Sequence, residues 1–166
     1  MIRFILLLCS VMFSVTLVAQ KNTQAYDIKT SEFKVKKVIE TFFEALHKGD
    51  STLMKSTLHK EVKIQTTSTD KKGLRILKTE PAATLLSSVA NKKPENIYFE
   101  KLLSYNIKVD GNLASVWTPY EFYVNGNFSH CGANSFQLFY NNNEWEIIFL
   151  VDMRRRDSCN ALKEKN

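Results

Sequence analysis

The C-terminal half of the chain alternates apolar and polar residues between short turn signals, and this pattern restricts the fold more than any other feature. Asp110-Gly111 and Asn125-Gly126 are typical of two-residue hairpin turns, and a third turn is expected in the Asn run at 141–143. Strands joined by such short turns are antiparallel neighbours. The sequence therefore predicts a meander of four strands, near residues 97–109, 113–124, 127–140 and 144–153.

Pro119 falls inside the second predicted strand, where it has no N–H to donate to a neighbouring strand. We therefore expect a β-bulge or a sheet edge at this residue. The four predicted strands are about 10–14 residues long, and strands of that length twist and bend rather than stay flat. A bent sheet of this kind can curl around helices and leave an open-mouthed cavity between them.

The preceding part of the chain contains helical patterns. Apolar residues between Val35 and Leu46 recur at the i, i+3, i+4, i+7 spacing of an amphipathic helix, with Thr30 or Ser31 as its N-cap and Gly49 at its end. Helices segregated from an antiparallel sheet indicate an α+β domain. The other elements expected here are a short helix after Asp50, strands at 62–69 and 74–78, and a third helix that begins at 79–81.

Residues 1–19 are expected to be a secretory signal peptide. Arg3 is their only charge, and Phe4 to Val18 is a nearly continuous apolar run that ends just before Ala19. A spanning helix needs about 20 apolar residues, so this run is short for a permanent anchor, and an uncleaved anchor is the alternative. We therefore predict an exported protein, periplasmic or extracellular, with no stable membrane span after signal cleavage.

The rest of the chain is predicted to form one domain, as its length allows. We expect a loose N-terminal segment at 20–30, a folded domain at 31–159 and a polar C-terminal tail at 160–166. The formal net charge of +6 becomes +5 once the single positive charge of Arg3 is removed. Basic proteins can bind nucleic acid, but export argues against that partner, and a solvated basic surface is the simpler interpretation.

Export also changes the meaning of the cysteines. Cys9 lies in the predicted signal peptide, whereas Cys131 and Cys159 remain in a compartment that permits disulfides. The sequence therefore predicts either one disulfide between these two residues or two free buried thiols.

Four segments carry a resemblance to a known family: 42–50 (Phe-Phe-Glu-Ala-Leu-His-Lys-Gly-Asp), 116–123 (Val-Trp-Thr-Pro-Tyr-Glu-Phe-Tyr), 126–132 (Gly-Asn-Phe-Ser-His-Cys-Gly) and 145–156 (Trp-Glu-Ile-Ile-Phe-Leu-Val-Asp-Met-Arg-Arg-Arg). Together with the order of elements, they resemble the nuclear transport factor 2-like superfamily, also called SnoaL-like or cystatin-like, over roughly residues 33–159. The nearest likeness is to a secreted bacterial branch labelled lumazine-binding by similarity, although the sequence contains no separate lumazine motif.

The resemblance implies a cone-shaped, curved antiparallel sheet packed on three helices, with a conical pocket. It also implies frequent dimerisation through the outer sheet face. It does not imply one activity, because members include isomerases, dehydratases, cyclases and binding modules. The last predicted strand is consistent with a homodimer, because Ile148 and Leu150 make its second face apolar beside the face of Trp145, Ile147 and Phe149.

The second hairpin supplies the candidate catalytic pair. A two-residue turn at Asn125-Gly126 would place Glu121 directly opposite His130, close enough for the carboxylate to orient the imidazole and tune its basicity. An exposed or structurally satisfied Glu–His pair is the alternative. The aromatic residues expected to wall a ligand pocket beside this pair are Trp117, Tyr123 and Phe128.

The last strand adds two charged candidates. If Tyr140 opposes Glu144, then Asp152 and Arg154 converge with His130 at one end of the sheet. Asp152 is then a second candidate partner for the imidazole, and Arg154 could bind an anionic ligand through its planar fork. The alternative is a salt bridge between Arg154 and a neighbouring aspartate.

These observations leave the function open between three hypotheses. The sequence contains no metal-binding His or Cys pair, no phosphate-binding Gly loop and no nucleophile elbow, so we predict neither a metal nor a cofactor. The favoured hypothesis is a non-catalytic domain that binds an unidentified small molecule. The alternatives are an isomerase or dehydratase that uses His130 with Glu121 or Asp152, and an interaction module whose cavity is filled by its own side chains.

Overall fold

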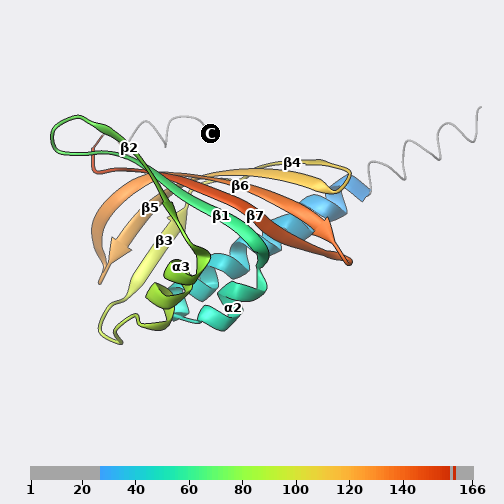
Figure 1. The fold of residues 1–166 in the computed structure, drawn as a ribbon, viewed down its shortest axis with the longest axis horizontal. Coiled ribbons are helices and arrows are strands. Elements are labelled where there is room, and N and C mark those ends of the chain that lie inside the picture. The colour runs from blue at the N-terminus through green and yellow to red at the C-terminus, as the bar shows by residue number, and fades with distance from the viewer. Residues whose placement is uncertain (1–26, 158, 160–166) are drawn as a thin grey trace, which may run out of the picture.

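The computed structural model describes residues 27–157 and 159, and within them seven strands form one curved sheet with helices on one side (Figure 1). The predicted signal peptide and polar tail, and residues 20–26 of the loose segment, lie outside the described residues. The helices are α1 (residues 27–48), α2 (Ser51–Ser56) and α3 (Ala82–Ala90). The strands are β1 (Leu58–Thr69), β2 (Arg75–Glu80), β3 (Tyr98–Leu102), β4 (Asn106–Asp110), β5 (Leu113–Val124), β6 (Asn127–Asn141) and β7 (Glu144–Arg155).

The predicted helices form, with changes at the starts of the first and the third. Thr79 and Glu80, expected at the start of the third helix, belong to β2, and α3 begins at Ala82. Residues 27–30 are already helical, so Thr30 and Ser31 lie inside α1 and do not cap it. Gly49 takes a positive φ of 75° at the end of α1, a conformation that glycine adopts without strain. Asp50 then caps α2, where its side chain accepts a hydrogen bond of 2.8 Å from the Leu53 N–H.

The sheet has the order β2-β1-β7-β6-β5-β3, with β4 also paired to β5. The local hairpins are antiparallel as predicted, but β1 runs parallel to β7, so the sheet is mixed rather than wholly antiparallel. No turn signal connects β1 with β7, and the sequence pattern therefore gave no information about this pairing.

The predicted strand at 97–109 is two strands, β3 and β4, and the break lies opposite Pro119. β3 pairs with the end of β5 and β4 with its beginning, and between them the Leu103 N–H donates to the Pro119 carbonyl at 2.8 Å. Because Pro119 has no N–H to return on that side, the ladder is interrupted there. On its other side Pro119 pairs with Ala133 of β6.

Two β-bulges shift the register of the central strands. Tyr123 pairs with Phe128 but Phe122 pairs with His130, which leaves Ser129 as the extra residue on β6. In the last hairpin, Ile148 is likewise the extra residue of β7, between the partners of Leu138 and Gln137. Each bulge reverses which residues of its strand face the helices.

The core lies between the helices and the inner sheet face, by which we mean the face turned toward the helices. Ile39 of α1, Val116 of β5, Phe136 of β6 and Ile147 of β7 are fully buried in it. The ring of Phe136 packs edge-on against Phe42, with ring centroids 5.8 Å apart.

Candidate functional site

A cavity of about 200 Å³ lies beyond this core, between the helices and the inner sheet face. Most of its wall is apolar, and polar groups converge from β3, β5, β6 and β7. Such a combination of an apolar wall with a few polar groups is typical of small-molecule sites. The apolar lining residues are Phe42, Phe43, Leu46, Ile64, Leu85, Tyr98, Phe122 and Leu150, and the polar ones are Thr66, Glu80, Glu100, Tyr120, His130, Asn134, Asp152 and Arg154.

Asp152 is the centre of the polar group. Its side chain is almost fully buried and accepts a hydrogen bond of 2.6 Å from the Thr66 hydroxyl of β1. It also forms a charged hydrogen bond of 2.5 Å with Arg154 Nε, and the Tyr120 hydroxyl lies 3.5 Å from its second oxygen. The salt-bridge alternative foreseen for Arg154 is therefore present, and its positive charge is offset inside the cavity.

Glu100 is a second carboxylate in the cavity, placed there by the pairing of β3 with β5. Its backbone N–H donates to His47 Nε2 of α1 at 2.9 Å, and its side chain accepts a hydrogen bond of 2.8 Å from the Asn134 amide. Burial raises the pKa of the Glu100 carboxyl to about 7, and the negative charge of Asp152 adds to this effect. The Glu100 carboxyl therefore titrates near neutral pH.

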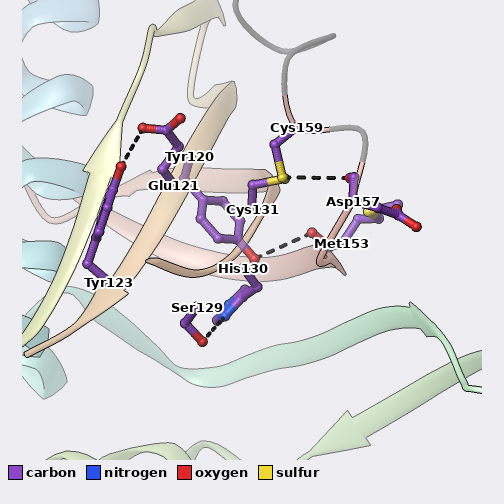
Figure 2. The surroundings of a disulfide bond; sticks show 9 residues. All are labelled: Tyr120, Glu121, Tyr123, Ser129, His130, Cys131, Met153, Asp157 and Cys159. Carbon is purple, nitrogen blue, oxygen red and sulfur yellow. Dashed lines mark hydrogen bonds between the residues drawn. A yellow bond between two sulfur atoms is a disulfide. The ribbon is translucent and has the colours of Figure 1, made fainter. Parts of the chain in front are cut away.

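His130 lies at the mouth of the cavity. Its ring packs at 4.9 Å from the ring of Phe122, and its Nδ1 is 3.1 Å from the Ser129 hydroxyl (Figure 2). Burial, together with the positive charge of Arg154, lowers the pKa of His130 to about 4. The imidazole is therefore neutral at pH 7.

The predicted pairing of Glu121 with His130 is wrong. The bulge at Ser129 moves Glu121 opposite Cys131 and turns it to the outer sheet face, while His130 faces the cavity. Glu121 is buried there and accepts a hydrogen bond of 3.0 Å from the Tyr123 hydroxyl (Figure 2). A short turn alone suggested the wrong partner because the bulge follows the turn by two residues.

The predicted aromatic wall is also placed elsewhere. Trp117 and Phe128 do not line the cavity and are 51% and 46% exposed. Tyr123 lies with Glu121, away from the cavity. The expected register of the last hairpin shifts as well, since Tyr140 pairs with Trp145 and not with Glu144. His130, Asp152 and Arg154 nevertheless line one cavity, as the sequence suggested.

Five polar residues of the cavity were not predicted from the sequence, namely Thr66, Glu80, Glu100, Tyr120 and Asn134. Asn134 had a detectable signal, because it lies two residues before Phe136 on an apolar strand face and is thus a polar residue at an inward position. Tyr120 follows the same parity from Val116. Glu100 carried no signal, because its position depends on the pairing of β3.

Cys131 and Cys159 are joined by a disulfide, with their Cα atoms 6.0 Å apart (Figure 2). The bond ties the segment that follows β7 to β6, next to His130 in the chain. In residues 27–157 and 159, no cluster of three or more metal-ligating side chains occurs. None of the helices in that part of the chain is long and apolar enough to cross a membrane.

Comparisons with known proteins place the fold. No family model matches the chain, and no curated protein matches it. The β subunit of a proposed aromatic-ring-hydroxylating dioxygenase from Novosphingobium aromaticivorans is similar with a TM-score of 0.62 and 11% identity, over 78% of this chain and 92% of that one. An NTF2-like protein of unknown function from Shewanella baltica has a TM-score of 0.57 and 17% identity, over 77% and 96%.

A proposed dehydratase of the NTF2-like family from Streptomyces avermitilis gives a TM-score of 0.57 at 12% identity, over 78% of this chain and 99% of that one. These likenesses show that the chain has the nuclear transport factor 2-like fold. Since that fold carries many unrelated functions, the function has to be argued from the site.

Proposed function

We propose that the protein binds a small, largely apolar molecule in the cavity under its sheet. The observation that carries this proposal is an apolar wall with polar groups that converge at one end. Similar folds are found in a proposed dehydratase and a proposed dioxygenase subunit.

The charges inside the cavity restrict the buried part of the ligand. The carboxyl side chains of Glu80, Glu100 and Asp152 line it, and Arg154 is the cation among the described lining residues. Asp152 pairs with Arg154, and Glu80 pairs with Lys78, which does not line the cavity. A buried anion would face these carboxylates at a cost, whereas a neutral hydroxyl or amide could donate to them. The part of the ligand inside the cavity is therefore neutral and hydrogen-bonding.

Two measurements test cavity binding. Native mass spectrometry of the gently purified protein asks whether a small molecule co-purifies. Calorimetry with 2-naphthol, a neutral two-ring probe, asks whether the cavity accepts an apolar body. Leu85→Trp fills the cavity from α3 and should lower the affinity for the probe by about tenfold or more. Leu77→Trp adds the same side chain at an exposed position of β2 and should leave the affinity unchanged. Equal affinity in wild type and Leu85→Trp would contradict the proposal.

An acid–base enzyme of the isomerase or dehydratase kind is the second candidate, and Glu100 is the observation that favours it. A carboxyl with a pKa of about 7 can both take and give a proton at neutral pH. Glu100 thus replaces Glu121 as the candidate acid–base group, with His130 and Asp152 in the same cavity. Deuterium uptake into C–H positions of the co-purified molecule in D2O, abolished in Glu100→Gln, would support catalysis, and an absence of uptake would leave binding alone.

We also propose that two copies pair through the outer sheet face. Trp117 and Phe99 are about half exposed on it, and Phe149 and Val151 of β7 face the same way. Trp117→Glu should then yield monomer in light scattering, whereas Phe33→Glu, at an exposed position of α1, should leave the dimer intact. A wild-type protein that stays monomeric at high concentration would refute the pairing.

Export is proposed on the strength of residues 1–19. Cleavage after Ala19 would leave Gln20 as the first residue of the mature protein. N-terminal sequencing of the protein recovered from the periplasm or medium checks this site, and an intact N-terminus would argue for the anchor instead.

A further inference from the structure

A basic groove adjoins the mouth of the cavity. It lies between the tip of the β1–β2 hairpin and the end of β7, which Figure 1 shows side by side at one edge of the molecule. His130 and Arg154 line both the groove and the cavity, so the two hollows meet at these side chains. The charged residues of the groove are Lys71, Arg154, Arg155 and Arg156, with Asp70 and Asp157 as the only carboxylates among its lining residues.

The arginines of the groove are only partly satisfied. Arg154 pairs with Asp152, but among the described residues the side chains of Arg155 and Arg156 form no ion pair. The buried Nε of Arg155 has no hydrogen-bond acceptor within this part of the chain, but Arg155 pairs with Cys131, so its side chain is on the outer sheet face and not on the face of His130 and Arg154. Arg156 is exposed and lines the groove. The groove thus has a cation whose charge no ion pair among the described residues offsets.

The covalent structure holds these arginines in place. Arg155 pairs with Cys131 in the β6–β7 ladder, and Cys131 is bonded to Cys159 just after β7. Figure 2 shows the disulfide, Met153 and His130 grouped at this end of the sheet. The cationic end of β7 is therefore held by the β6–β7 ladder and by the disulfide. This restraint reduces the entropy that binding would cost.

The electrostatics differ sharply across the mouth. Inside, carboxylates outnumber cations, whereas the groove has the side chains of Lys71, Arg154 and Arg156 against two carboxylates. The positive charges of Arg154 and Arg156 are felt at His130, whose pKa they lower in addition to the effect of burial. An anionic group is therefore disfavoured in the cavity and favoured in the groove.

We propose that the groove is the anion subsite of the same ligand site, so that the ligand is an amphipathic organic acid. Its apolar body lies in the cavity, and its carboxylate, sulfonate or phosphate group lies against Arg156 at the mouth, beside the paired Arg154. This inference rests on the proposed function, because it places the apolar body of the ligand in the cavity. It keeps the expectation of an arginine-bound anion and adds Arg156 to Arg154.

A matched pair of probes tests the subsite. 2-Naphthol and naphthalene-2-sulfonate share one apolar body and differ in the anionic group. Calorimetry on the full chain at low salt should give the sulfonate about tenfold or more higher affinity than the naphthol, because one charge-assisted contact is worth about that factor. Arg156→Gln should reduce this ratio toward one. Arg75→Gln removes the same charge at an exposed site on β2 outside the groove and should leave the ratio unchanged.

The outcomes separate the two proposals. Equal affinity of both probes for wild type would overturn the anion subsite while cavity binding stands, and failure of both probes would remove the proposed function as well. Sulfonate binding that persists in Leu85→Trp would indicate an adventitious surface anion and would also overturn the inference. As an independent readout, NMR titration should show that the sulfonate, and not the naphthol, raises the pKa of His130, since a bound anion offsets the charges of Arg154 and Arg156.

Discussion

In both halves of β7, alternate side chains point to the inner sheet face, but the two sets have different surroundings. Before the bulge at Ile148, Trp145 and Ile147 are buried in the packed core. After it, Asp152 and Arg154 face a hollow space with polar walls. Without the bulge the second half would turn Asp152 to the outer face, so one extra residue lets a single strand support both core and site.

The comparison teaches where the stability of the molecule comes from. At the packed end, side chains are in close contact and their burial stabilises the fold. At the hollow end, a cavity remains empty of protein atoms and the carboxyl of Glu100 is held where burial opposes its charge. The hollow end therefore stabilises the fold less, and the disulfide lies at this end.

Truncating one phenylalanine at each end should show the largest contrast. Phe136 is fully buried at the packed end, so Phe136→Ala should cost about 3–5 kcal/mol of unfolding free energy. Phe122 already borders the cavity, so Phe122→Ala should cost only about 1–2 kcal/mol. Urea denaturation of the two variants measures both values, and equal losses would show that the hollow end is packed as firmly as the core.

Removing the disulfide should have the second largest effect on stability. The bond links positions 28 residues apart, so Cys159→Ser should destabilise the oxidised protein by about 3 kcal/mol through chain entropy. Urea denaturation with and without reductant measures the effect. Wild type in reductant should match Cys159→Ser, and a variant as stable as the oxidised wild type would mean that the disulfide is dispensable.

Much of this architecture could be predicted from local sequence signals. The hairpin turns, the cap at Asp50 and the break at Pro119 each follow from a residue with one strong conformational preference. The bulges at Ser129 and Ile148 could not be predicted, because neither residue has a side chain that demands one. They depend on how the sheet bends over the helices.

The candidate site was predictable where the two bulges act together. His130, Asp152 and Arg154 lie in one cavity because the bulge in β6 and the bulge in β7 turn all three toward it. Glu121 was misplaced because the bulge at Ser129 turns His130 inward, whereas Glu121 on β5 stays on the outer face. Glu100 was not foreseen because a pair between β3 and β5 brings it from a distant part of the chain. Residue pairs set by nonlocal contacts thus limit what periodicity can predict.

A smaller effect is expected at Gly132 of β6, which faces β7 without a side chain. A Cβ on Gly132 would lie 1.7 Å from the Met153 carbonyl oxygen and 3.0 Å from the Tyr120 ring, so the strands would have to separate. Gly132→Ala should therefore cost about 1–3 kcal/mol. Urea denaturation checks this value, with Ser135→Ala of the same strand as a control that should stay within about 0.5 kcal/mol. If Gly132→Ala left the unfolding free energy unchanged, the two strands could separate locally without a cost in stability.

The smallest effect concerns the charge at the hollow end. The pKa of Glu100 is about 7 in the folded state against an ordinary 4.5, so the folded protein holds this proton more tightly than the unfolded chain. Stability should therefore fall as pH rises from about 4.5 to 7 and stay lower above it. His130 acts in the opposite sense, because its folded pKa of about 4 makes stability fall as pH drops below 6.5.

Glu100→Gln isolates the first of these two effects. Between pH 5 and 8, wild type should lose about 1 kcal/mol relative to Glu100→Gln, a value reduced from the full shift because the side chain is partly exposed. Urea denaturation at both pH values measures the difference, with the exposed Glu144→Gln as a control that should follow wild type. If the stability of Glu100→Gln has the same pH dependence as that of wild type, the Glu100 carboxyl is solvated. In that case its ionisation does not destabilise the hollow end relative to the packed end.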